Sequence, residues 1–240
     1  MPLSGAFWVG QFPGSRSIAD LELDFGQRVQ RFLNAISSAR AGLPDARAAN
    51  ARSGAPNFAG PVVVGAPAGA VAQAGPAQRV QHPHVQINAT FRPAQRAYMM
   101  HYSWLITRNQ IDPVHVPAYQ PIGNQQTPVD IQWVHRDRSG RPDIAASMRA
   151  ALEMVNGFQI ANLHVAPALD SNHVHGRAID MTISWVGNME IVDNLNQTVL
   201  INTLPRNGTN RRLIELGATY QVYHLRHVSA DPPHWSYNGH

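Results

Sequence analysis

The 240-residue sequence predicts an α+β fold, in which a small mixed or antiparallel sheet is flanked by helices. Two patterns support this class: residues 85–91 alternate apolar and polar side chains, as a half-buried strand does, and residues 17–38 repeat apolar side chains at helical spacing. Helical and strand-like segments do not alternate regularly, which disfavours a parallel sheet built from βαβ units. A chain of this length can bury one large core or two small ones.

The N-terminal segment, residues 1–40, is predicted to contain one amphipathic helix over residues 17–38. Ser17 and Asp20 make a plausible capping box at its start. We expect the helix to pack on the rest of the fold, and a helix that binds a partner is the alternative. Its apolar residues recur every three or four positions: Ile18, Leu21, Phe25, Val29, Phe32, Leu33 and Ile36.

Residues 41–81 are rich in Ala, Gly and Pro and hold few large side chains. Such a composition offers little apolar surface to bury and many turn formers, so we predict a flexible linker or loop inserted in the fold. A long loop without structure of its own usually acts as a functional flap or is disordered. The remaining residues, 82–240, are predicted to form the domain that carries the chemistry.

A strand over residues 85–91 and a helix from Pro93 to about Thr107 are predicted to open this domain. Proline is tolerated in the first helical turn, because the N–H that it lacks has no partner there. Arg92 therefore lies at a strand-to-helix junction, where functional side chains are often displayed. The alternative is a structural role, in which its guanidinium caps a carboxylate.

The second half of the domain predicts further short elements. Residues 112–128 are spaced by prolines and predict a loop, and residues 129–134 alternate as a short strand does. Asp143 is a predicted N-cap, and Gly157 is the predicted end of the helix that follows. One face of that helix is expected to hold Ile144, Met148, Ala151, Leu152 and Val155.

Residues 179–185 and 189–192 predict two strands, which a turn at Gly187-Asn188 would join into a pair. A helix is predicted from about Asn210 to Leu216, ending at Gly217. Residues 220–225 predict one more strand.

The residues best suited to chemistry lie in two short groups. His173 and Asp180 are seven residues apart, and Asp231 and His234 follow near the C-terminus. A zinc site of the catalytic kind takes three protein ligands and leaves its fourth position to water. The chain contains no Cys, so only His and carboxylate side chains are available as ligands. His175 would share the face of His173 in an extended segment and is the alternative ligand.

Both groups resemble the signatures of a known family, the D-alanyl-D-alanine carboxypeptidase-like zinc peptidases, which include the VanX/VanY and phage endolysin group. Residues 89–93, Ala-Thr-Phe-Arg-Pro, are similar to the strand-end Tyr-Arg-Pro segment of the same family. The resemblance extends from about Val85 to the C-terminus. The motif S-x-H-x-x-G-x-A-x-D is matched by Ser171, His173, Gly176, Ala178 and Asp180, and the motif D-x-x-H by Asp231 and His234.

The resemblance implies a hedgehog/DD-peptidase-like fold and one zinc ion per chain, with His173, Asp180 and His234 as its ligands. It implies Asp231 as the general base and Arg92 as a contact of the substrate or of the transition state. An Asp before a proline is also a common turn former, which is the alternative for Asp231. Two further residues, Ser171 and Trp235, are expected to line the substrate site.

The function that the resemblance implies is that of a zinc metallopeptidase, which hydrolyses amide bonds in the stem peptides or cross-links of peptidoglycan. Its partners would be peptidoglycan peptides, together with an immunity or secretion partner if the protein is an exported effector rather than a lysin. The alternative is a non-catalytic, zinc-containing binding module of the same fold. Asp231 disfavours that alternative, because a binding module needs no base beside its metal. A purely structural zinc site is weaker still, since three ligands leave the coordination open.

The charge pattern and the N-terminus add expectations about partners and location. All 19 basic residues are Arg, against 15 acidic residues, which suits a polyanion such as phosphate or a cell-wall polymer. A genome that favours Arg codons is the alternative. The arginines are scattered, so no nucleic-acid partner is expected. The chain has neither a typical signal peptide nor a run of eighteen apolar residues. We therefore expect no stable membrane insertion, synthesis in the cytoplasm, and action in the periplasm or cell wall after non-standard export or lysis.

Overall fold

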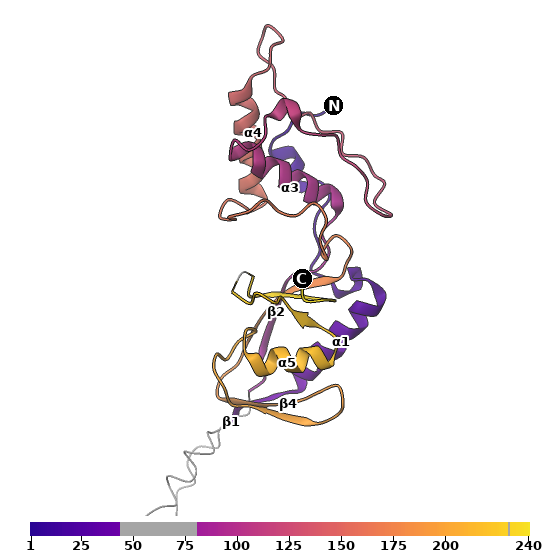
Figure 1. Cartoon of the computed structure of the whole chain (residues 1–240), viewed down its shortest axis with the longest axis vertical. Coiled ribbons are helices and arrows are strands. Elements are labelled where there is room, and N and C mark those ends of the chain that lie inside the picture. The colour runs from indigo at the N-terminus through magenta and orange to yellow at the C-terminus, as the bar shows by residue number, and fades with distance from the viewer. Residues whose placement is uncertain (44–80, 230) are drawn as a thin grey trace, which may run out of the picture.

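The computed structural model describes residues 1–43, 81–229 and 231–240, and it combines helices with two antiparallel sheets (Figure 1). The α+β class is therefore confirmed. Most of the predicted linker, residues 44–80, lies outside the described part of the chain. Residues 41–43 of that predicted linker are described, and they belong to a strand, Arg40–Leu43, in which Ala41 pairs with Gln81. None of the helices in the described ranges combines the length and the apolar character that crossing a bilayer requires.

Helices and strands mix along the chain without regular alternation. The helices are η1 (Ala6–Gly10), η2 (Ile18–Asp20), α1 (Leu23–Ser38), α3 (Ala94–Thr107), η3 (Pro113–His115), α4 (Ile144–Gly157) and α5 (Arg211–Thr219). The strands are β1 (Arg40–Leu43), β2 (His84–Ala89), β3 (Ala178–Ser184), β4 (Asn188–Val192), β5 (Thr198–Ile201), β6 (Tyr223–His224) and β7 (His234–Ser236).

Figure 1 shows two lobes. The buried apolar side chains form two separate cores, one in each lobe. The helical lobe contains η1, α3 and α4, and the sheet lobe contains α1, α5 and both sheets (Figure 1). Large buried side chains of the helical lobe include Trp8, Met99, Trp133 and Met154, and those of the sheet lobe include Phe25, Phe32, Met181 and Trp235. The chain passes between the lobes within residues 11–17, 90–93 and 158–177.

The four-stranded sheet positions the candidate ligands. Its strand order is β2-β3-β7-β6, and all of its neighbouring strands are antiparallel. In this register Asp180 on β3 lies opposite His234 on β7 and opposite Ala89 on β2. Three segments that are distant in sequence therefore meet at one end of this sheet. The second sheet has the order β1-β4-β5.

The predicted N-terminal helix is divided in the structure. Ser17 accepts a hydrogen bond from the Ala19 N–H at 3.2 Å and caps only the short 3-10 helix η2. The α-helix α1 begins six residues later, at Leu23, so the prediction of one helix over residues 17–38 is wrong at its start. The predicted apolar face is buried, since Phe25, Val29, Phe32 and Ile36 are all fully enclosed in the sheet-lobe core.

The predicted pairing of residues 179–185 with residues 189–192 is wrong. These segments are β3 and β4, and they belong to different sheets. The connection bends at Gly187, whose φ is +68°, and a Cβ there would lie 2.8 Å from the Cα of Gly42. The turn therefore passes tightly against β1, which pairs with β4 in place of β3.

Other elements follow the sequence more closely. β2 and α3 occur where predicted, with Pro93 as the N-cap of α3, and Asp143 caps α4 by accepting the Ala146 N–H at 2.9 Å. Residues 129–134 are not a strand, although Gln132 forms a bridge with Leu3. α5 continues through Gly217, and β6 spans two residues only. Of the side chains expected on the buried face of α4, Ile144 and Leu152 are exposed.

Candidate metal centre

His173, Asp180 and His234 converge at one end of the four-stranded sheet, beside the junction of the lobes. One potential ligand atom from each side chain lies within 4.8 Å of the others. Nε2 of His173 and Nδ1 of His234 each lie 3.1 Å from the same carboxylate oxygen, Oδ1 of Asp180. Both histidines are buried, and Asp180 is partly buried.

Local backbone geometry brings His173 to the strands. The chain turns after His173 at Gly176, whose φ of +67° favours glycine, and a Cβ there would lie 2.8 Å from the Glu22 backbone nitrogen. The Arg92 N–H donates to the His173 carbonyl at 3.1 Å. The segment that holds His173 is thus fixed against two other parts of the chain.

Two backbone oxygens set the tautomers of the histidines. Nδ1 of His173 lies 2.7 Å from the Thr90 carbonyl oxygen, and Nε2 of His234 lies 3.2 Å from the backbone oxygen of His240. Because a backbone oxygen can only accept, each of these nitrogens carries the hydrogen. The other nitrogen of each neutral ring therefore presents its lone pair to Asp180. Such a backbone contact to the outer nitrogen is typical of histidine ligands in metal sites.

The donor set fits a divalent metal ion. Two imidazole lone pairs and a carboxylate oxygen face one another, and this arrangement is repulsive unless a cation or protons lie between them. Two His and one carboxylate are a ligand set that proteins use for zinc. Zinc–ligand bonds of ~2.1 Å in a tetrahedron place neighbouring ligand atoms ~3.4 Å apart. The two nitrogen–oxygen distances of 3.1 Å are close to that value.

The charges of the cluster reinforce one another. Burial by itself would raise the pKa of Asp180. When no metal ion is bound and the rings of His173 and His234 are protonated, their hydrogen bonds and positive charges outweigh burial and hold this pKa well below its usual range. Burial would lower the pKa of His234, yet the hydrogen bond and the charge of Asp180 raise it. Asp180 is thus ionised at neutral pH and available as a ligand.

Asp231 and Arg92 lie in the electrostatic field of this cluster. Asp231 is exposed as a residue, but its carboxyl is partly desolvated by its surroundings. This desolvation and the negative charge of Asp180 raise the pKa of Asp231, against the opposing effects of His234, His173 and Arg92. Burial lowers the pKa of Arg92, and the charges of Asp180 and Asp231 oppose that shift. The Asp231 carbonyl also accepts the His234 N–H at 3.1 Å, which closes the turn between these two residues. The structure thus brings together three of the five residues expected to act on zinc, water or substrate, and it places the other two, Asp231 and Arg92, where the charges of the cluster affect them.

Other sequence-predicted residues have different surroundings. His175 is exposed, and its Nε2 lies 2.6 Å from Oδ1 of Asp170, outside the cluster. Trp235 has no exposed surface and packs against Phe32 on the opposite face of β7 from His234, so it supports the strand and does not line the site. The Ser171 hydroxyl oxygen is buried and has no hydrogen-bond partner within the described residues.

The residues that fix the tautomers were missed by the sequence reasoning. Thr90 and His240 act through backbone oxygens, which every residue possesses, so their side chains give no signal. The side chains of Asn172 and Ser236 also donate to the His240 backbone oxygen, at 2.6 and 3.0 Å. Together these contacts fix the oxygen that sets the orientation of His234.

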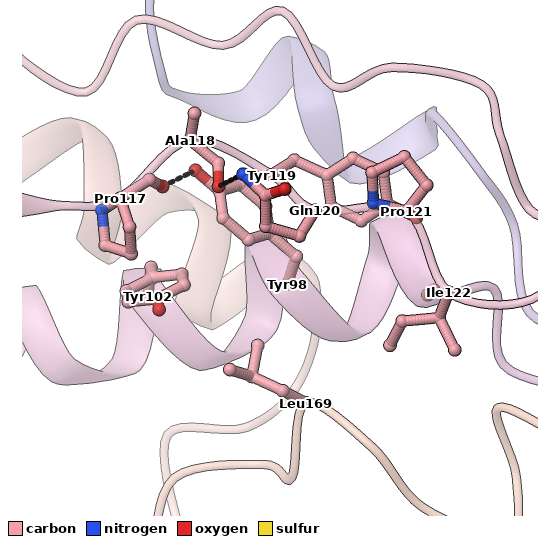
Figure 2. Close-up of a pocket in the computed structure, with 10 residues that line it drawn as sticks. Tyr98, Tyr102, Pro117, Ala118, Tyr119, Gln120, Pro121, Ile122 and Leu169 are labelled. Atoms are coloured by element: carbon pink, nitrogen blue, oxygen red, sulfur yellow. Dashed lines mark hydrogen bonds between the residues drawn. The ribbon is translucent and has the colours of Figure 1, made fainter.

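An aromatic pocket of about 230 Å³ lies on the helical lobe, between α3 and residues 117–122 (Figure 2). Figure 2 shows the Tyr98 hydroxyl bonded to the Pro117 carbonyl, a distance of 2.8 Å. Gln125 connects this region to the metal centre, because its side chain accepts the Ala94 N–H at 2.6 Å and donates to the Val174 carbonyl at 3.0 Å. Among the described residues that line this pocket, Tyr98, Tyr102 and Tyr119 are the ionisable ones.

Comparison of the chain with protein-family models, with curated proteins and with solved structures found no match. A function can therefore be proposed only from the geometry and chemistry of the residues described above and from the resemblance of their motifs.

Proposed function

We propose that this chain is a zinc-dependent peptidase that hydrolyses amide bonds in the stem peptides or cross-links of peptidoglycan. The observation that carries the proposal is the cluster of His173, Asp180 and His234, whose fixed tautomers direct two lone pairs and a carboxylate oxygen to one point. Three ligands leave room for a water molecule, as an enzyme needs and a structural site does not. The choice of peptidoglycan as substrate follows from the motif resemblance.

Each residue has a defined task in this proposal. A zinc ion held by the three ligands would supply Lewis acidity and lower the pKa of a water molecule toward ~7. Asp231 would accept a proton from the attacking water molecule and pass it to the leaving amine. Its raised pKa suits this work, since a base is most effective when its pKa lies near the working pH. The Arg92 guanidinium stabilises the oxyanion that develops on the carbonyl.

The replacement Asp231→Asn tests the peptidase proposal. It keeps the size of the side chain and removes the ability to accept a proton, while the three ligands stay in place. We expect the zinc content to be unchanged and the hydrolysis of purified peptidoglycan to fall by about 10²–10⁴-fold, the usual contribution of a positioned general base. New termini released from peptidoglycan, identified by mass spectrometry, give both the activity and the bond that is cleaved.

The matched control is Asp170→Asn, which removes an exposed carboxylate that contacts His175 and should leave the activity unchanged. A wild-type protein that binds zinc and peptidoglycan but releases no new termini would contradict the proposal. The chain would then be the non-catalytic binding module that the sequence offers as the alternative.

A further inference from the structure

A second pocket adjoins the metal centre and is lined by three arginines. It encloses about 290 Å³ between α3, the end of β2 and the segment after η1. Arg16, Arg92 and Arg96 contribute to its wall, together with the polar Ser15 and Asn88, and no acidic side chain lines it. Arg92 belongs to both sites, since it also interacts electrostatically with Asp180 and Asp231. Ala89, which lines the pocket, pairs with Asp180 in the sheet, so the pocket lies beside the candidate metal centre.

Arg96 is held at this pocket without a carboxylate partner among the described residues. Its Nη1 donates to the Val9 carbonyl at 3.2 Å, and its guanidinium carbon lies 4.7 Å from the centre of the Phe158 ring. These two contacts fix the plane of the guanidinium and leave N–H groups along its other edge. Burial and the nearby positive charge of Arg92 both lower the pKa of Arg96.

This arrangement is costly in the free protein. Arg92 and Arg96 are four residues apart and repel each other, and burial removes part of the water that would screen them. The acids that offset the charge of Arg92, Asp180 and Asp231, lie at the metal centre. An oxyanion in the pocket would offset the repulsion, because guanidinium groups bind carboxylate and phosphate oxygens with paired, charge-assisted hydrogen bonds.

We propose that the pocket lined by Arg16, Arg92 and Arg96 is a binding site for an oxyanion, a carboxylate or a phosphate group. If the proposed function holds, the substrate would carry such a group next to the cleaved bond, and this part of the inference rests on the proposed function. The anion site itself does not depend on hydrolysis.

Titration of the full-length protein, as purified, with inorganic phosphate and with succinate tests the inference. Binding is followed at constant ionic strength by NMR, through the backbone amide signals of residues 14–16 and 88–96 and the arginine Nε–H signals. We expect saturable shifts in these residues and binding about 10-fold weaker in Arg96→Gln and in Arg16→Gln. Arg16 is exposed, so its replacement leaves the fold intact even if Arg96→Gln, which loses the Val9 and Phe158 contacts, unfolds the protein.

The control is Arg149→Gln, which removes an exposed arginine of α4 and the same net charge. Its affinity should stay within about twofold of that of the wild type. Binding of succinate alone identifies a carboxylate as the natural group, and binding of phosphate alone identifies a phosphate. No saturable shift with either probe, or an equal loss in Arg149→Gln, overturns the inference. Because the experiment measures binding, anion binding by a protein without peptidase activity would still confirm the anion site. An active peptidase that binds no anion would refute the anion site and leave the proposed function standing.

Discussion

His173 and His175 are two residues apart, and the structure gives them opposite surroundings. His173 is buried, with one ring nitrogen on the Thr90 carbonyl and the other on Asp180. His175 is exposed and pairs with the surface residue Asp170. Between them the chain approaches the turn at Gly176, so the two rings diverge instead of sharing a face as they would in an extended segment. This geometry favours His173 over His175 as the candidate ligand.

Metal analysis of two alanine variants checks that selection. We expect His173→Ala to lose most of its zinc after dialysis, because two ligands hold the ion poorly and zinc sites derive their affinity from the complete set. His175→Ala should retain about one zinc per chain, as the wild type does. Full zinc occupancy in His173→Ala, with loss in His175→Ala, would show that the ligand is the other histidine.

The sequence predicted which side chains converge in the candidate site but not the contacts that orient them. His173, Asp180 and His234 were identifiable because their side chains form a spaced motif. The oxygens of Thr90 and His240 were not, because backbone groups are brought to a site only by the complete fold. Trp235 was misplaced for a related reason: a strand sends neighbouring side chains to opposite faces, and the sequence did not show which face met the core.

Gly217 illustrates how an element depends on its packing. It lies inside α5, where a Cβ would come within 2.6 Å of the Trp235 ring and 3.0 Å of the Val222 carbonyl oxygen. Glycine in a helix is commonly a terminator, and the sequence was interpreted in that way. The structure shows instead that the helix continues and that the missing side chain permits close contact with the sheet.

The replacement Gly217→Ala is expected to destabilise the protein. Alanine improves helix propensity by ~1 kcal/mol. Overpacking against a buried tryptophan typically costs about 1–3 kcal/mol, and this cost should outweigh the gain because α5 and the strand that carries Trp235 would have to move apart. The control is Gly26→Ala in α1, where the nearest atoms to a Cβ lie at an ordinary 3.4 Å. Urea unfolding measures both. A Gly217→Ala protein as stable as Gly26→Ala would show that the Trp235 ring can move aside with little loss of stability.

Elements governed by local chemistry were predicted well, and those governed by distant contacts were not. Asp143 marks the start of α4 through a hydrogen bond to a residue three positions away, which the sequence displays directly. The turn at Gly187 resembled a hairpin, yet its strands separate because β1 competes for β4. That competition involves Gly42, which no local pattern connects to Gly187.

At the scale of the molecule, the candidate metal centre lies where the two lobes meet. Asp180 and His234 belong to the sheet lobe, and His173 belongs to a segment that leads from one lobe to the other (Figure 1). The next residue, Val174, is buried in the core of the helical lobe, and its carbonyl oxygen accepts a hydrogen bond from the Gln125 side chain. The two separate cores were not evident from the sequence, because residues of both alternate along the chain.

This position predicts that zinc stabilises both lobes together. An ion bound only by the folded protein adds about 2.7 kcal/mol at a free concentration of 100 times its Kd. The ion would join β3 and β7 to the segment of His173, and through Val174 and Gln125 that segment is anchored on the helical lobe. Hydrogen exchange followed by mass spectrometry should therefore show slower exchange on zinc addition in both β3 and α3. His234→Ala should abolish the change in both, whereas His175→Ala should preserve it. Slower exchange confined to β3 in the wild type would mean that the lobes open independently and that the metal centre belongs to the sheet lobe alone.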